Sequence, residues 1–307
     1  EHHELILEPE SVELLPRLVS GFDEPFADSS AIPTYYVSKF AREFVTVVLS
    51  GDGGDELFAG YNNYMKALSV KNSLFSNGLF NPFWNILHRT LPSNVSGKGL
   101  SYFLSKKRSD LGAYFCVMKK NERSSLFNDR TLNRIGSYSS EADRIQMLNC
   151  SSSKDFVSRL EEFDLLNYLP GDILTKVDRT SMKNSLESRV PIIDHEFAEL
   201  SFKIPSELKI NNNEGKLIFK KMLSKYLPEN VMKHKKQGFG VPISIWFKDD
   251  LKTYVNDRLL NQNALIYDHL NYSAVSKIIG NQNFGMRDFS GQIWAILFLE
   301  EWLKQNR

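Results

Sequence analysis

The 307-residue sequence predicts an α/β fold with a parallel sheet, on three observations. Helical and extended patterns alternate between residues 11 and 64, which is typical of parallel α/β sheets. The extended segment VTVVL, residues 45–49, is apolar without alternation, as expected of a strand that helices cover on both faces. It runs into the loop SGDGGDE, residues 50–56, and functional sites in such sheets gather at the carboxyl ends of strands.

The elements of this unit follow in chain order. HELILEP, residues 3–9, has the pattern of a short strand, and SVELLPRLVSGF, residues 11–22, that of a capped helix. An irregular segment, residues 23–34, precedes a helix at residues 35–44. The strand VTVVLS, residues 45–50, then delivers the glycine loop to the edge of the sheet.

The remainder of the chain is predicted to be helical. Residues 65–150 have many Gly and Pro breaks and predict short irregular helices, and their basic cluster KKR at 106–108 is read as a solvated helix face. Helical spacing returns at residues 155–169 and 175–189 and closes the chain at 291–305. One stripe of this last helix is expected to lie in the core: Trp294, Leu297, Phe298 and Trp302.

Composition excludes several classes of partner. Lys plus Arg number 38 and Asp plus Glu 37, so the overall charge predicts neither nucleic acid nor a membrane surface as partner. No apolar run approaches the roughly 20 residues of a spanning helix. Two cysteines, Cys116 and Cys150, form no CxxC pair and suit a reducing cytoplasm. The chain opens without an initiator Met, and we expect it to be a piece of a longer protein.

The loop at 50–56 combines glycines with acids. Glycines 51, 53 and 54 let the backbone approach a ligand and present N–H groups to an anion, whereas the acids at 52, 55 and 56 repel bare phosphate. A hard cation between acid and phosphate reconciles the two, because Mg²⁺ is held by one or two carboxylates plus phosphate oxygens. The loop therefore predicts a Mg-nucleotide site, although a turn whose acids cap the next helix explains it equally well. No GxxxxGK[ST] P-loop and no EF-hand pattern is present here.

Two further polar clusters follow the loop. The first lies at residues 168–197 and holds these charged side chains: Asp172, Lys176, Asp178, Arg179, Glu187 and Arg189. Helical spacing places Asp172 and Lys176 four apart on one face, and a salt-bridged helix is the plain explanation. The second is KHKKQGFGVPISIW, residues 233–246, a basic loop with two glycines that either closes over a phosphate or is a solvated turn.

Taken together and in this order, the three clusters resemble the synthetase domain of the asparagine synthetase family. The matching stretches span residues 23 to 302: DEPFADSSAIPTYYVSKFAR, VVLSGDGGDELFAGYNNY, LPGDILTKVDRTSMKNSLESRVPIIDHEF, KKQGFGVPISIW and GQIWAILFLEEWL. The resemblance implies a PP-loop ATPase fold, in which residues 1–64 form the C-terminal part of the nucleotide-binding sheet. Residues 65–150 and 151–307 then complete the synthetase domain.

The resemblance also implies a reaction and its cofactors. The aspartate side-chain carboxylate attacks the α-phosphorus of ATP, pyrophosphate leaves, and ammonia displaces AMP from β-aspartyl-AMP. ATP and Mg²⁺ are the implied cofactors, and aspartate and ammonia from glutamine are the implied substrates. Relatives that act on other carboxylates, including β-lactam-forming synthetases and amidotransferases, leave the acyl acceptor open. A non-catalytic interaction domain is the alternative of another class.

Matched positions acquire roles through the resemblance. Ser50 and Gly51 match the Ser-Gly that contacts ATP, with Gly53, Gly54 and Glu56 in the same nucleotide-binding loop. Asp55 matches the Mg²⁺-binding acid, and Lys236 a lysine that neutralises charge in phosphoryl transfer. Asp52 matches the acid that takes a proton from ammonia, where the family's usual residue is Glu, and Asp172 is expected to be catalytic.

Two parts of the family pattern do not occur in the 307 residues. These are the glutaminase domain, with its cysteine at the start, and the SGGxDS loop that grips pyrophosphate. We therefore expect this chain to hold half of an ATP site, to be inactive by itself, and to associate with the upstream glutaminase and SGGxDS segment. The strand at 45–49 is then expected to have an unpaired edge and exposed apolar surface. A homodimer is among the expected assemblies, in the cytoplasm.

Overall fold

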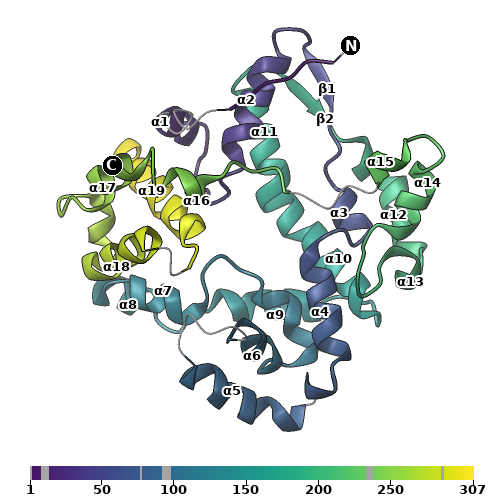
Figure 1. Ribbon diagram of the computed structural model, residues 1–307, viewed down its shortest axis with the longest axis horizontal. Coiled ribbons are helices and arrows are strands. Elements are labelled where there is room, and N and C mark those ends of the chain that lie inside the picture. The colour runs from purple at the N-terminus through teal and green to yellow at the C-terminus, as the bar shows by residue number, and fades with distance from the viewer. Residues whose placement is uncertain (1, 8–13, 77, 92–97, 233–237, 285–286) are drawn as a thin grey trace.

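The computed structural model of the protein is mostly helical, with a small parallel sheet at one end (Figure 1). It describes residues 2–7, 14–76, 78–91, 98–232, 238–284 and 287–307. Helices α16 to α19 form a group on one side of the molecule, α12 to α15 a group on the other, and α5 and α6 lie at the end opposite the strands (Figure 1). The cavity described below lies between α2 and α11, next to the strands.

Two strands pair in parallel, which confirms the predicted parallel sheet, although the second strand was not predicted. β1 spans Val47–Leu49 and β2 spans Glu187–Arg189, with Val47 opposite Glu187 and Leu49 opposite Arg189. The prediction of helix through residue 189 was wrong, because α11 ends at Met182 and the chain turns at Ser185 with a φ of 56°. A β2 strand of three residues carries too little alternation to show in the sequence pattern.

β1 is less covered than its apolar sequence predicts. The side chains of Val47 and Leu49 are 39% and 74% exposed, so the expectation of helices over both faces was wrong for the described residues. Only β2 pairs with β1 in that part of the chain, through bonds such as Ser50 N–H to Arg189 O at 2.8 Å. The predicted exposed apolar surface at this strand is thereby confirmed.

Helix α2, Ala31–Ala41, begins earlier than the sequence predicts. Ser30 N–H donates to Asp28 Oδ1 at 2.9 Å, a local turn that ends the irregular segment and leads the chain into the helix. Pro33 is tolerated because it lies in the first turn, where no intrahelical acceptor needs its missing N–H. The predicted strand at 3–9 was wrong for residues 3–7, which form no strand, and residues 8 and 9 lie outside the described part.

A first core joins the two ends of the chain. Helices α1 and α19, Leu15–Val19 and Ser290–Gln305, pack together with α16 to α18, Ile243–Trp246, Lys252–Leu259 and Tyr272–Asn283. The predicted stripe on the last helix is confirmed: Trp294, Leu297 and Phe298 are at most 1% exposed, and Trp302 packs against them partly buried.

A second core lies under the middle of the chain, where the predicted short helices are confirmed. Helix α4, Asn62–Asn72, packs on α10, Phe156–Leu166, together with the buried Leu104 of α6 and Leu148 of α9. The helices between α4 and α10 are α5, Asn81–Thr90; α6, Lys98–Leu104; α7, Lys120–Leu126; α8, Asp129–Ile135; and α9, Ser140–Asn149. The remaining helices are α3, Gly54–Leu57; α11, Thr175–Met182; α12, His195–Lys203; α13, Ser206–Lys209; α14, Leu217–Leu223; and α15, Glu229–Met232.

A buried ion pair fastens α13 to α10 beside this core. Lys209 Nζ lies 2.9 Å from Glu161 Oε2, and both side chains are 0% exposed. Burial raises the pKa of Glu161 to about 7, against the favourable charge of Lys209, and the Ala59 N–H also donates to this carboxylate. Since Ala59 follows α3, the pair braces the segment that carries the glycine loop.

Removing the cation of this pair is expected to destabilise the fold. Lys209→Met leaves the Glu161 carboxyl buried without its partner, which should lower the free energy of unfolding by about 3–5 kcal/mol. Urea denaturation measures the change. Lys220→Met, which breaks the more exposed Lys220–Glu214 pair, is the matched control and should cost about 1 kcal/mol or less. Equal losses of unfolding free energy in the Lys209→Met and Lys220→Met proteins would contradict a stabilising role of the buried Lys209–Glu161 pair.

Candidate active site

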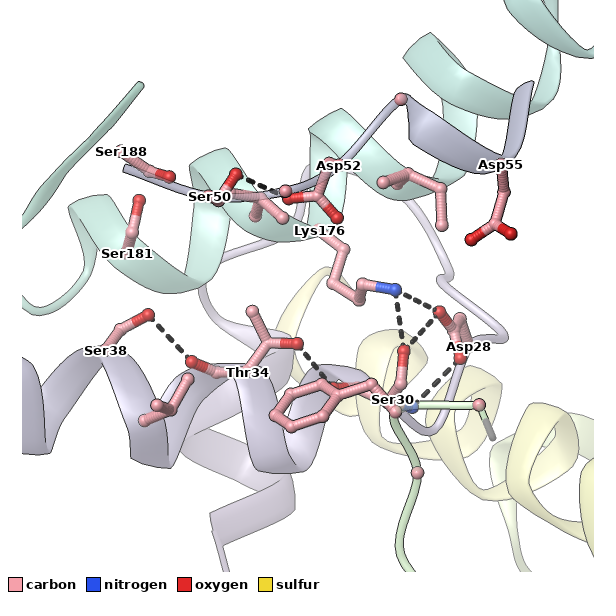
Figure 2. Close-up of a pocket in the computed structure, with 18 of the residues that line it drawn as sticks. Asp28, Ser30, Thr34, Ser38, Ser50, Asp52, Asp55, Lys176, Ser181 and Ser188 are labelled. Atoms are coloured by element: carbon pink, nitrogen blue, oxygen red, sulfur yellow. Dashed lines mark hydrogen bonds and ion pairs between the residues drawn. The ribbon is translucent and has the colours of Figure 1, made fainter. Parts of the chain in front are cut away.

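A cavity of about 840 Å³ lies between α2, the glycine loop after β1, and α11 (Figure 2). This volume is in the range of pockets that hold small ligands. Hydroxyl side chains from all three elements line it: Ser29, Ser30, Thr34, Ser38, Ser50, Ser181 and Ser188. Charged side chains join them: Asp28, Asp52, Asp55, Glu56 and Lys176. The cavity therefore offers hydrogen bonds to a polar ligand and carries more acids than bases among the described residues.

The glycine loop turns sharply at Gly53. Its φ of 86° is left-handed, and a Cβ there would lie 2.1 Å from Ile193 Cγ2. Glycine is required at this position both for the backbone angle and for the space. The turn starts α3, whose first residues face the cavity, so the sequence folds the chain back on itself directly after β1.

The first residues of the loop are open to the cavity. Ser50 Oγ donates to Asp52 Oδ2 at 2.7 Å, which fixes the orientation of that carboxylate (Figure 2). A Cβ on Gly51 would meet no atom within 4 Å, so the backbone here is accessible to a ligand. The structure thus brings Ser50, Gly51 and Asp52 together at the strand end, as the sequence predicts.

Asp55 has a partner that the sequence analysis missed. Lys216 Nζ lies 2.9 Å from Asp55 Oδ1, with side chains 24% and 17% exposed. Gly60 leaves the space for this pair, because a Cβ on it would lie 2.1 Å from Asp55 Oδ1. Lys216 stands at the N-cap of α14 and belongs to no motif, so no sequence signal links it to Asp55.

Glu56 lies at the base of the loop and is 1% exposed. It accepts a hydrogen bond from Tyr61 Oη, and burial raises its pKa despite that bond. The side chain therefore braces Tyr61, which also lines the cavity. A direct contact of Glu56 with nucleotide stays a prediction.

Lys176 makes a buried ion pair with Asp28 across the cavity floor (Figure 2). Its Nζ lies 2.6 Å from Asp28 Oδ2 and 2.6 Å from Ser30 Oγ, and the residue is 7% exposed. Burial opposes ionisation of Asp28, but the ammonium of Lys176 and hydrogen bonds from Lys176 and Ser30 outweigh it and lower the pKa. The sequence analysis noted Lys176 but missed Asp28, which lies 148 positions away.

The predicted Asp172–Lys176 salt bridge was wrong. Asp172 lies in a π-helical segment, Leu169–Leu174, in which a spacing of four no longer aligns side chains as in an α-helix. Lys176 pairs with Asp28 instead. Burial and the charge of Asp28 raise the pKa of Asp172 to about 7, and its Oδ1 receives no hydrogen bond from the described residues.

Asp172 lines a second cavity, of about 650 Å³, beside the first. Tyr61, Asn63 and Tyr168 line both cavities, and the Tyr61 and Tyr168 rings lie 5.6 Å apart, edge to face. These side chains form a partition between the two. Asp172 therefore stands behind the first cavity, close enough to feel the charges of Asp28 and Lys176.

The residues of the first cavity fit a cation that arrives with phosphate better than a resident metal. No cluster of three or more His, Cys, Asp or Glu side chains able to hold a metal occurs in the described part of the chain. Asp52 and Asp55 supply two carboxylates at the glycine loop, the number that Mg²⁺ typically takes when phosphate oxygens complete its shell.

The helices described in the structure include none long and apolar enough to cross a membrane.

Comparison with known proteins decides the family. A family model described as asparagine synthase matches residues 1–304. The chain belongs to the asparagine synthase family. The resemblance inferred from the sequence motifs is thereby confirmed.

Curated relatives carry the same family name and are longer. The chain is 32% identical over 303 residues to glutamine-hydrolyzing asparagine synthetase 1 of Bacillus subtilis (strain 168), covering 95% of this chain and 45% of that protein. A putative glutamine-hydrolyzing asparagine synthetase of Mycobacterium tuberculosis (strain H37Rv) is 30% identical over 304 residues, covering 95% and 44%. The chain therefore spans a little under half the length of these relatives.

Not every predicted site residue of this asparagine synthase family member falls in the described structure. Lys236 lies outside the described residues, and its role stays a prediction. The glycines that follow it, Gly238 and Gly240, line the cavity together with Phe239. The basic loop therefore borders the first cavity through residues 238–240.

The strained glycine of the loop provides a test of this geometry. Gly53→Ala should lower the free energy of unfolding by about 2 kcal/mol or more, because it adds a Cβ at a φ of 86° against Ile193. Gly51→Ala, which meets nothing within 4 Å, is the control and should change stability by less than about 0.5 kcal/mol. Thermal and urea unfolding measure both. A Gly53→Ala protein as stable as the Gly51→Ala protein would contradict the left-handed turn at Gly53 and its close contact with Ile193.

Proposed function

We propose that the protein containing this chain makes asparagine from aspartate through β-aspartyl-AMP, with ATP as the activating substrate. The observation that carries the proposal is the hydroxyl-lined cavity around an open glycine loop at the end of β1, in a chain of the asparagine synthase family. The relatives are named glutamine-hydrolyzing asparagine synthetases, which supports glutamine as the source of ammonia.

The glycine loop is proposed to hold the nucleotide. Ser50, Gly51 and Gly53 line the cavity. The backbone N–H groups of this loop, which include that of Gly54, are proposed to bind the phosphates. A parallel strand leading into such a loop is also the arrangement of a PP-loop ATPase, the fold we propose for the complete domain. Glu56 supports the loop from below through Tyr61.

The acids of the loop are proposed to act with Mg²⁺. When bound, the ion would offset the negative charge of the phosphates. Asp55 is the proposed ligand, and Lys216 holds its carboxylate in position from the side of α14. Lys236 is proposed to add positive charge near the phosphates from the basic loop.

Two acids are proposed to handle protons. Amide formation from an ammonium source releases a proton, which a nearby carboxylate can accept. Asp52 faces the cavity, held by Ser50, and is the proposed acceptor at the glycine loop. Asp172 is proposed as a second catalytic acid, because its pKa near 7 suits proton transfer at neutral pH.

ATP–pyrophosphate exchange in the protein that contains this chain tests the proposed function. Radiolabelled pyrophosphate should enter ATP only when aspartate is present, because the exchange reverses adenylation of its carboxylate. Exchange driven by a different carboxylate would assign the protein to an amidotransferase or β-lactam type of activity. Absence of exchange with any carboxylate would favour a non-catalytic interaction domain.

Loss of the proposed metal ligand should abolish activation. Asp55→Asn is expected to slow aspartate-dependent pyrophosphate release about 10²-fold or more, because one of the carboxylates that shares the cation is lost. The control is Asp250→Asn, at an exposed position between α16 and α17 that does not line the cavity. Wild-type pyrophosphate release by the Asp55→Asn protein would refute the assignment.

The raised pKa of Asp172 predicts a pH dependence. Since the acid accepts protons only when ionised, kcat/KM should rise as pH increases through about 7. Asp172→Asn should lower activity and remove this rise, because asparagine does not titrate. If kcat/KM of the Asp172→Asn protein still rises through pH 7, the rise belongs to a different titrating group.

Residues 1–307 taken by themselves are expected to bind Mg-ATP weakly and to form no asparagine. The family resemblance assigns a second phosphate-gripping loop and a second metal-binding acid to an SGGxDS segment that this chain lacks. Without them the triphosphate meets Asp52 and Asp55 with incomplete cation compensation. Isothermal titration of Mg-ATP measures the affinity. Micromolar binding, or asparagine formed from aspartate, ATP and ammonia, would contradict the half-site proposal.

A further inference from the structure

The charge of the chain is unevenly distributed along the sequence. Residues 57–109 contain no Asp or Glu and seven Lys or Arg residues, whereas the whole chain has a formal net charge of +1. The rest of the chain is therefore net acidic. The bases of the segment are Lys66, Lys71, Arg89, Lys98, Lys106, Lys107 and Arg108. A stretch of this length without acids is unusual for a soluble domain in which about a quarter of the residues are charged.

The same segment exposes several large apolar side chains. We call this set the α5 face, and it consists of Leu74, Phe75, Leu79, Phe83 and Ile86. Leu79 and Ile86 are 84% and 64% exposed. Phe83 and Ile86 lie three positions apart on α5 and so share one side of it, and Leu74, Phe75 and Leu79 lie in the turns before the helix. Helix α5 has no buried residue of its own.

Contacts on the other side of α5 fix this face outward. His88 packs against Tyr102 of α6 with ring centroids 5.2 Å apart, and its Nδ1 lies 3.1 Å from Lys98 O. Trp84 Nε1 donates to Phe75 O at 2.9 Å and so ties the preceding turn to the helix. The inward side of α5 is thereby occupied, and the α5 face cannot turn to cover itself.

Exposed bases border the α5 face. Arg89 follows Ile86 by one turn of α5 and is exposed. Arg108 Nη2 donates to Ser73 O at 3.1 Å, which brings the exposed Lys107 and Arg108 beside the start of the face.

Lys106 behaves differently from the solvated face that the sequence predicts. It packs between the Tyr102 and Tyr114 rings, 4.5 and 4.7 Å from their centroids, and burial lowers its pKa.

Helix α5, which carries part of the α5 face, lies at the opposite end of the molecule from β1 (Figure 1). A segment that paired with the open edge of β1 would meet the sheet at that distant end. A segment paired with β1 therefore does not itself cover the α5 face.

We infer that the α5 face docks on the surface of an anionic lipid bilayer, with α5 lying in the headgroup region. Large apolar and aromatic side chains on one side of a helix, bordered by Arg and Lys, are the composition of interfacial helices. Each base near an anionic surface strengthens binding by about fivefold, and the absence of acids removes repulsion. The overall charge balance, from which the sequence analysis expected no membrane partner, conceals this local asymmetry.

Vesicle sedimentation with the protein that contains this chain tests the inference. We expect co-sedimentation with phosphatidylcholine vesicles containing phosphatidylglycerol, and little with phosphatidylcholine alone. The double variant Phe83→Ser, Ile86→Ser should reduce the bound fraction more than tenfold. Arg89→Gln with Lys107→Gln should reduce it by about the same factor and weaken its salt dependence.

Matched controls separate docking from loss of the fold. Phe284→Ser removes an aromatic side chain that is 84% exposed but lies at the C-cap of α18, and it should leave sedimentation unchanged. Circular dichroism verifies that each variant is folded. The inference would be overturned if the Phe83→Ser, Ile86→Ser protein sedimented with anionic vesicles as well as the unmodified protein does. It would also be overturned if the unmodified protein did not bind anionic vesicles. Self-association that this variant abolishes, without vesicle binding, would identify a second copy as the occupant and also overturn it.

Discussion

The buried ion pair between Lys176 and Asp28 is the interaction on which the candidate active site depends. It joins α11 to the turn before α2, and these two helices make the floor of the first cavity. Inside a protein such a pair stabilises only when both ions are also hydrogen-bonded, a condition that Ser30 meets for Lys176 and Asp28 alike. The same pair contributes to the environment of Asp172, whose pKa rises because the group is buried and because the Asp28 carboxylate lies close by.

The glycine loop depends in turn on partners from distant parts of the sequence. Gly53 turns against Ile193, and Asp55 is held by Lys216 over the space that Gly60 leaves. The β1 strand that delivers the loop is itself held by β2, which precedes Ile193 by a few residues. The region after α11 therefore shapes the loop from outside, which explains why the family motifs are spread over most of the chain.

Sequence reasoning found the parts of the site that local chemistry marks. A glycine loop with acids at the end of an apolar strand can be recognised from the sequence, because the backbone freedom of glycine and the charge of the acids depend only on residues that are neighbours in the chain. It missed Asp28 and Lys216 because their roles arise from contacts with Lys176 and Asp55 far along the chain. It misassigned the partner of Lys176 because the π-helical turn at Leu169–Leu174 changes the spacing, and no residue type announces such a turn.

A double-mutant cycle on the Lys176–Asp28 pair tests this account most directly. Free energies of unfolding are measured for Asp28→Asn, Lys176→Met and the double variant in the protein that contains this chain. If the pair holds α2 and α11 together, each single change leaves a buried group unpaired, and the double variant should be more stable than the sum of losses predicts by about 2 kcal/mol or more. Losses that add to within about 0.5 kcal/mol would contradict the claim.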